Sequence, residues 1–380
     1  MAKVFIEETS LTAIGDAIRA KTGDSALMSP AEMAEAIEGI TTGGGGSGDL
    51  PEEALTITGD CQYRFASNGW NWFIEQCGDE ITTKDISNAN NMFNGSGNLT
   101  SIPFDLNFSN STYRSMGSMF NNCENLKEIG DINNAYPSDM GSMFNGCRRL
   151  RQLPTFNNLN LDRMHSYATA SFRGMFMYCH SLRSIPEEFL KSLSKPTATS
   201  YLYPVFSGGF SNCSALDEIR GLNPQTGAMT SNMFSGTFTS CYRLKDIIFA
   251  VQEDGSPYEV NWKSQTIDLT LNTGCASVYT IYHMTDYNSG ITSDKRVTDD
   301  ASYQALKNDP DWWTTLEAYS RYNHDSAVNT INSLPITTNT GCTIKFRGAL
   351  GSATDGGAIN TLTEEEIAVA AAKGWTVTLV

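Results

Sequence analysis

The fold is decided by the pattern in Met119-Phe120-Asn121-Asn122-Cys123-Glu124-Asn125-Leu126-Lys127-Glu128-Ile129. Counted from the phenylalanine, the cysteine is at position +3, the leucine at +6 and the isoleucine at +9. Five other stretches between residues 90 and 250 keep these offsets, with Ser96 replacing the cysteine in the first of them and Leu153 replacing the isoleucine in another. The residues predicted to form a repeated core are Phe93, Phe120, Cys123, Leu126, Phe144, Cys147, Leu150, Phe176, Cys179, Leu182, Phe210, Cys213, Leu216, Phe238, Cys241 and Leu244.

The spacing between the copies varies, although the motif does not. Successive phenylalanines are 27, 24, 32, 34 and 28 residues apart, which is typical of stacked repeat units joined by loops of different length. Met119 and Cys123 lie four residues apart, as on one face of a helical turn, and Leu126 to Ile129 leads into an extended stretch. We therefore predict an α/β repeat solenoid over residues 52–254, with a short helical turn and a short strand in each unit.

Residues 1–42 predict a small helical hairpin. Leu11, Ile14 and Ile18 fall at helical spacing, and Ser29-Pro30-Ala31-Glu32 has the composition of a helix start. A glycine-rich linker follows at residues 43–51, so we expect the hairpin to be a separate module that anchors or oligomerises the protein. The alternative is that the hairpin packs on the neighbouring domain.

Residues 324–380 predict C-terminal repeat units and a cap. The sequence Thr363-Glu364-Glu365-Glu366 is typical of a capping box at a helix start, and Trp375, Val377 and Leu379 alternate as in a strand. An atypical last unit covers the exposed end of a solenoid, and this segment fits that role.

Residues 255–323 predict an irregular, aromatic-rich insertion between these two parts. Aromatic side chains among Asn, Asp and Ser are typical of surfaces that bind proteins or glycans. The alternative is that the rings pack the insertion onto the solenoid. The candidate ligand-binding residues are Trp262, Tyr303, Trp312, Trp313, Tyr319 and Tyr322.

The charge of the chain argues against nucleic-acid binding. There are 42 acidic and 26 basic residues, a net charge of -16, which repels a phosphate backbone. The sequence has no run of the roughly 20 apolar residues that a membrane span needs, and its first residues do not have the pattern of a secretory signal. We expect synthesis in a cytoplasm and no insertion into a membrane.

No catalytic, metal or cofactor site is expected. The nine cysteines include no CxxC pair, so buried free thiols are favoured over disulfides or metal ligands. None of the four histidines lies in a HExxH motif, and His180 is expected at the surface of a repeat. The sequence contains no GxSxG motif and no phosphate-binding loop, and adjacent carboxylates such as Glu187 and Glu188 are read as solvated charges.

The repeat resembles the leucine-rich repeats of the BspA type, which occur in bacterial surface proteins and in bacteriophage proteins. Cys123, Cys147, Cys179, Cys213 and Cys241 match the small buried position of that family. The stretch from Leu11 to Gly23 and the ending from Gly357 to Val377 are similar to segments of phage virion and tail-associated proteins.

The resemblance implies a non-enzymatic virion protein: a tail fibre, head fibre or receptor-binding protein. Its repeats would bind a host cell-surface protein or glycan, and its hairpin would contact other virion proteins. The resemblance further implies a homo-oligomer, with a trimer favoured, assembled in the host cytoplasm. Two alternatives stay open: a structural virion component that contacts other capsid or tail proteins, and a BspA-like bacterial adhesin.

Deletion of residues 1–42 tests this modular organisation. Because a flexible linker separates the hairpin from the repeats, we expect the truncated chain to keep the circular dichroism spectrum and thermal unfolding transition of the repeats. We also expect it to be absent from assembled particles. Unfolding of the truncated chain would contradict a separate hairpin.

Overall fold

The computed structural model describes residues 56–109, 115–161, 172–193, 206–224, 233–270, 324–346 and 362–380, apart from positions 69–70, 72–73, 76–77, 214, 242–243, 245 and 263. Between residues 279 and 314 it describes only the backbone of three strands. The predicted hairpin at residues 1–42 and the linker at 43–51 lie outside the described residues.

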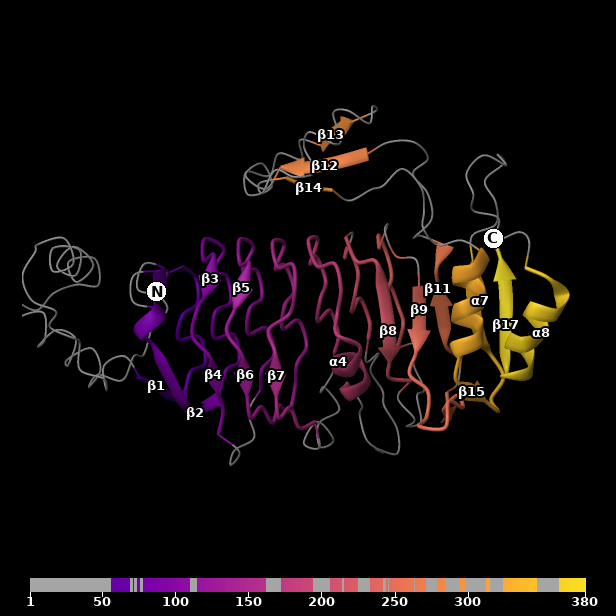
Figure 1. Ribbon diagram of the computed structural model, residues 1–380, viewed down its shortest axis with the longest axis horizontal. Helices are drawn as coiled ribbons and strands as arrows, with labels where there is room; N and C mark the ends of the chain where they lie inside the picture. The colour runs from indigo at the N-terminus through magenta and orange to yellow at the C-terminus, as the bar shows by residue number, and fades with distance from the viewer. Residues whose placement is uncertain are drawn as a thin grey trace, which may run out of the picture.

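Short parallel strands connect each segment of the chain to the next one along the sequence. Strand β1 (Thr56–Asp60) pairs with β2 (Thr82–Asn88), and β3 (Ser101–Ile102) pairs with β5 (Glu128–Ile129). Strands β4 (Leu106–Asn107), β6 (Ile132–Asn133) and β7 (Phe156–Asn157) form a three-stranded parallel sheet. The 3-10 helix η2 (Gly78–Glu80) precedes β2. As Figure 1 shows, these segments follow one another along the long axis of the molecule in sequence order.

The same arrangement continues into the C-terminal half. Strands β8 (Glu218–Leu222) and β9 (Asp246–Phe249) pair in parallel, and helix α4 (Glu187–Ser192) contacts β8. Strands β11 (Thr266–Asp268), β16 (Cys342–Phe346) and β17 (Trp375–Leu379) form a parallel sheet, while β10 (Glu259–Val260) pairs with β15 (Ile336–Thr337). Helices α7 (His324–Ser333) and α8 (Glu364–Ala372) contact each other beside them.

The insertion begins later than the sequence predicted. Residues 259–268, assigned to an irregular insertion starting at 255, supply β10 and β11, which pair in parallel with strands about 77 residues further along the chain. The stack therefore includes these residues. Within the remaining segment, β12 (Tyr279–His283) pairs in antiparallel fashion with β13 (Asp294–Val297) and with β14 (Trp312–Thr314).

The Met-Phe-x-x-Cys stretches are successive hydrogen-bonded turns and not the short helical turns that the sequence predicted. The residues two before and two after each repeated phenylalanine have left-handed φ angles between 53° and 78°. These positions hold Gly, Asn, Ser or Tyr and no β-branched residue, because Cβ makes this conformation costly. The residues are Tyr63, Ser67, Asn91, Gly95, Ser118, Asn122, Ser142, Gly146, Gly174, Tyr178, Gly208, Asn212, Gly236 and Ser240.

The alternating backbone directs half of its amides along the chain and half to the next repeat unit. In the unit of Phe120, the amide of Asn121 donates to the Ser118 carbonyl at 3.1 Å within the same turn. The amides of Ser118, Phe120 and Asn122 donate instead to the next unit, at distances of 2.9, 2.9 and 2.7 Å. Each turn thus needs its neighbour to satisfy its polar groups.

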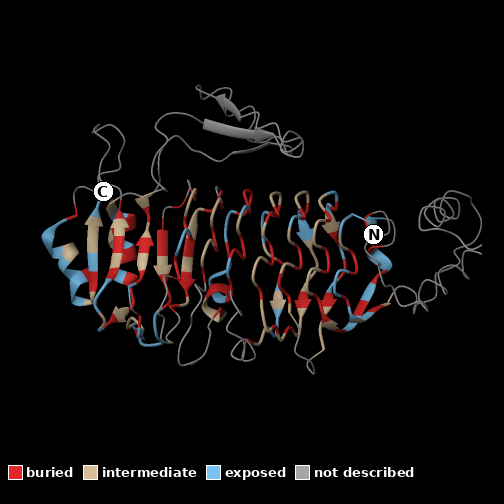
Figure 2. Ribbon diagram, turned by 180° about the vertical axis from the view of Figure 1, so that it is seen from behind, coloured by how far each residue is buried: buried red, intermediate tan, exposed pale blue. Residues whose placement is uncertain are grey.

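A stack of phenylalanine rings fills the interior. Seven rings lie face to face with centroids 5.3 to 6.0 Å apart and interplanar angles of 5° to 15°. We call them the phenylalanine stack: Phe65, Phe93, Phe120, Phe144, Phe176, Phe210 and Phe238. Figure 2 shows the buried residues running through the row of strands along its whole length.

The capping box predicted in the C-terminal segment is confirmed. Thr363 precedes α8, its hydroxyl accepts the Glu366 amide at 3.2 Å, and the Glu366 carboxylate accepts the Thr363 amide at 2.8 Å. The helix ends before Gly374, which has a φ of +84° and lies directly against the Thr337 carbonyl. Trp375 then starts β17 and donates from its indole to the Pro335 carbonyl at 2.9 Å.

Replacing Phe144 with alanine should lower the free energy of unfolding by about 3–5 kcal/mol, because it removes a fully buried ring that has neighbours on both faces. Urea unfolding followed by circular dichroism measures the loss. The control is Tyr63→Ala, since this ring is 52% exposed and should cost below about 1 kcal/mol. Equal losses in the two variants would place Phe144 outside the core.

Candidate functional site

The repeated residues predicted from the sequence all lie in the interior. Every phenylalanine, cysteine and leucine of the repeated motif is at most 1% exposed. These side chains hold the units together and leave the positions between them to face solvent. A functional site on this molecule must therefore use the outer residues.

The repeat cysteines form hydrogen bonds between neighbouring units. The Sγ atom of Cys147 donates to the carbonyl of Phe120, in the preceding unit, at 3.1 Å, and the Cys147 amide donates to Phe144 at 3.0 Å. Four other repeat cysteines donate in the same way to the phenylalanine one unit earlier, at 2.9 to 3.1 Å. In the first copy, the hydroxyl of Ser96 takes this place and donates to Phe65 at 2.6 Å.

These thiols are not reactive groups. The seven cysteines in the described part of the chain are free and buried. Burial raises the pKa of Cys241 to about 12 and raises the pKa of Cys123, Cys147, Cys179 and Cys213 well above the usual thiol value. Because the thiolate is the nucleophile, these side chains stay protonated and unreactive at neutral pH.

One of the candidate ligand-binding aromatic residues belongs to the core. Trp262 is fully buried, with its ring 5.7 Å from Phe234 and 6.0 Å from Trp375. It links the repeat units to the C-terminal strands and cannot contact a ligand at the surface. Trp312 and Trp313 lie in β14, but their side chains are outside the described residues, as are Tyr303, Tyr319 and Tyr322.

His180 is also buried, although the sequence analysis placed it at the surface. Burial and the adjacent Arg148 lower the pKa of His180 to about 3, so the ring is neutral at physiological pH. The Arg148 guanidinium lies 3.5 Å from His180 Nε2, 3.4 Å from the Glu124 carboxylate and 6.0 Å from the centre of the Tyr178 ring. This cluster joins three successive units.

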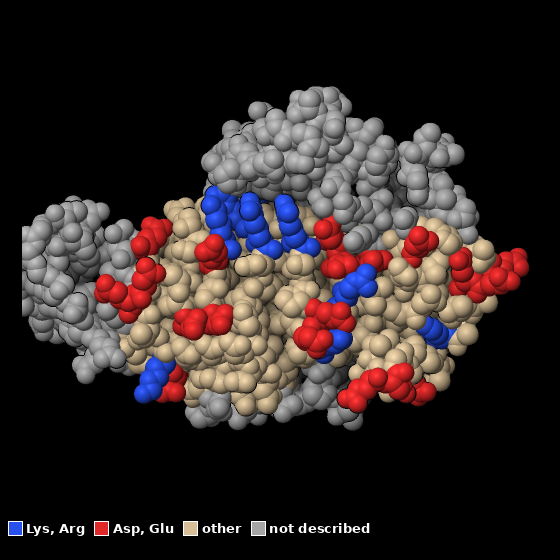
Figure 3. All heavy atoms as spheres, in the orientation of Figure 1, with Lys and Arg blue, Asp and Glu red and all other residues tan. Residues whose placement is uncertain are grey.

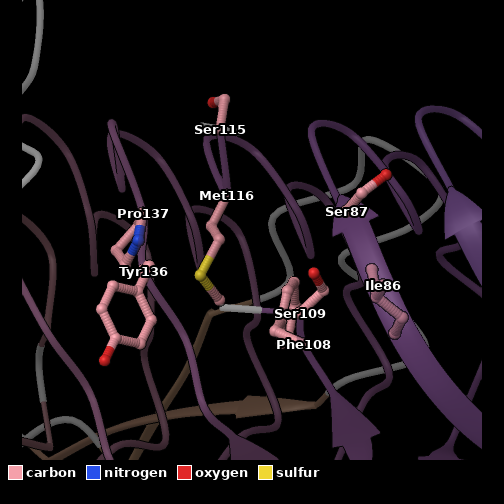
Figure 4. Close-up of a pocket in the computed structure, with 8 residues that line it drawn as sticks. All are labelled: Ile86, Ser87, Phe108, Ser109, Ser115, Met116, Tyr136 and Pro137. Carbon is pink, nitrogen blue, oxygen red and sulfur yellow. The ribbon is translucent and has the colours of Figure 1, made fainter. Parts of the chain in front are cut away.

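A shallow pocket lies beside β2 and β4. Figure 4 shows its lining, which includes Phe108, Met116 and Tyr136 together with Ser87, Ser109 and Ser115. Its enclosed volume is only about 10 Å³, far below the roughly 300–1,000 Å³ of small-molecule sites. Its dimensions suit ordered water better than a substrate.

The outer positions of the repeat include a row of cations. Lys127, Arg151 and Arg183 each follow the stacked phenylalanine of their unit by seven residues, and each is exposed. Figure 3 shows a group of blue side chains side by side near the upper edge of this face, while acidic side chains are scattered over the rest of it. We call Lys127, Arg151 and Arg183 the cation row.

The described ranges contain neither a metal-binding cluster nor a membrane-spanning helix. Among those residues, His, Cys, Asp and Glu side chains form no group of three or more that could hold a metal ion. In the same part of the chain, no helix has the length and apolar character needed to cross a membrane. No protein-family model matches the sequence, and no curated protein matches it.

Cys147→Ala should lower the free energy of unfolding by about 1–2 kcal/mol, because it removes a buried hydrogen bond between units and leaves a small cavity. Cys147→Ser should lose less, since Ser96 fills the equivalent position with a hydroxyl donor. Urea unfolding of both variants measures the difference. A serine variant no more stable than the alanine variant would show that the donor does not contribute.

Proposed function

We propose that this chain is a leucine-rich-repeat-like α/β solenoid that acts as a non-enzymatic attachment protein of a bacteriophage particle. In this proposal the repeats bind a protein or glycan of the host cell surface, and residues 1–42 anchor the chain to other virion proteins. The chain then acts as a tail fibre, head fibre or receptor-binding protein, and a homotrimer is the expected assembly.

The observation that carries this proposal is that each repeat unit has constant buried positions and variable outer positions. The phenylalanine, cysteine and leucine positions are used for stacking, and they stay nearly constant from unit to unit. An outer position in neighbouring units varies freely, as Thr100, Lys127, Arg151, Arg183 and Asp217 do at one place in the repeat. Such a constant interior with a variable, extended exterior is what a recognition scaffold needs.

The resemblance of both ends of the sequence to phage proteins supports the virion setting. Attachment also accounts for the net charge of -16 better than nucleic-acid packaging does, since an acidic protein repels DNA.

Binding of the fluorescently labelled full chain to intact bacteria and to isolated envelopes tests the function. We expect saturable binding to the envelope of the host, a trimeric mass by light scattering, and no release of glycan fragments during incubation. Released fragments would show an enzyme. Failure to bind any envelope, combined with a monomeric mass, would contradict an attachment fibre.

A further inference from the structure

Backbone hydrogen bonds between neighbouring units fix the positions of the residues in the cation row. The amide of Lys127 donates to the Thr100 carbonyl at 2.9 Å, that of Arg183 to the Arg151 carbonyl at 3.4 Å, and that of Asp217 to the Arg183 carbonyl at 3.1 Å. Close to Arg151, the Arg149 amide donates to the Glu124 carbonyl of the preceding unit at 3.2 Å. The three cations therefore occupy equivalent places in adjacent units.

This placement fixes the spacing of the charges. Neighbouring parallel segments lie about 4.8 Å apart, so the row presents one positive charge at each such step. Like charges in adjacent strands repel one another. Lys127, Arg151 and Arg183 form no ion pair with any residue that the structure describes, whereas Arg148, in the same unit as Arg151, is paired with Glu124.

The charge of the whole chain makes the row more distinctive. The chain has 42 acidic and 26 basic residues. An exposed cation at the same position of three consecutive units therefore contrasts with the acidic excess of the chain as a whole. The described row ends at Thr100 on one side and at Asp217 on the other. A positive strip on an acidic surface attracts and orients an anionic partner.

Tyr178 supplies an exposed aromatic ring beside Arg148, which belongs to the same repeat unit as Arg151. Its ring is 39% exposed and lies 6.0 Å from the Arg148 guanidinium. Its backbone has a left-handed φ of 62°, at a position where all six other units have Ser, Gly or Asn. A bulky residue is costly in this conformation, so its presence indicates a use for the ring. Aromatic faces beside cations suit a partner with both apolar faces and anionic groups, as sugar rings with charged substituents have.

We propose that the cation row binds an anionic polysaccharide whose repeating sugars carry carboxylate or phosphate groups, and that the exposed ring of Tyr178, beside Arg148, packs against one of the sugars. The row is linear and periodic, so it fits a linear polymer with regularly spaced charges. This inference rests on the proposed attachment function and names the ligand class for it.

The test compares two charge-reversal variants of the full chain. Arg151→Glu with Arg183→Glu reverses two members of the row. The matched control, Lys84→Glu with Lys345→Glu, changes the net charge equally in β2 and β16, away from the row. Lys84, Arg151 and Arg183 are exposed and Lys345 is half-buried, so thermal unfolding by circular dichroism verifies that each variant folds. The probes are immobilised alginate (carboxylate), phosphomannan (phosphate), neutral dextran and poly-L-glutamate.

We expect the unaltered chain to bind alginate or phosphomannan at least about tenfold more tightly than dextran at low salt, and the row variant to lose about tenfold in affinity. The control variant should stay within about twofold of the unaltered chain. Tighter binding to poly-L-glutamate would assign the row to an acidic protein and overturn the proposal, as would equal effects of the two variants or no binding to either anionic polysaccharide. If the row variant still attaches to bacterial envelopes like the unaltered chain, the ligand assignment fails while the attachment function stands.

Discussion

The hydrogen bonds and ring contacts between one repeat unit and the next are the constraint on which the rest of the structure depends. In five of the turns, the carbonyl of the stacked phenylalanine accepts an amide of its own unit and a cysteine thiol of the following unit. The alternate amides of the turn need acceptors in that following unit. A single unit would leave these groups unsatisfied in an apolar interior, so the units are stable only as a stack.

Much of this interior could be predicted from the sequence, because each position in it has one stringent requirement. Only a ring of the size of phenylalanine continues the stack, and only a small donor fits above the phenylalanine carbonyl of the preceding unit. Cysteine and serine meet the second requirement, which explains why Ser96 can interrupt the cysteine series. The capping box before α8 was equally readable, since both of its hydrogen bonds join side chains and amides within four residues.

Other features depend on the backbone or on distant contacts, so the sequence pattern alone does not predict them. A four-residue spacing such as Met119 to Cys123 occurs in a helix and also in successive turns; the signal for turns was the Gly, Asn or Ser at positions such as Ser118 and Asn122. The unit of Phe65 escaped notice because Asn68 and Asn71 replace its cysteine and leucine. Trp262 looked like a surface aromatic residue, and only the fold brings it against Phe234 and Trp375. The three cations of the cation row have the same spacing from their phenylalanines in the sequence, but only the stacking of the units brings them side by side.

The central claim is that consecutive phenylalanines contact one another in sequence order within one continuous core. A double-mutant cycle measures this directly, with Phe120→Leu and Phe144→Leu as the adjacent pair and Phe93→Leu and Phe210→Leu as the distant pair. The account predicts a coupling energy of about 0.5–1.5 kcal/mol for the adjacent pair, whose ring centroids are 5.4 Å apart, and below about 0.5 kcal/mol for the distant pair. Additive effects at Phe120 and Phe144 would contradict it.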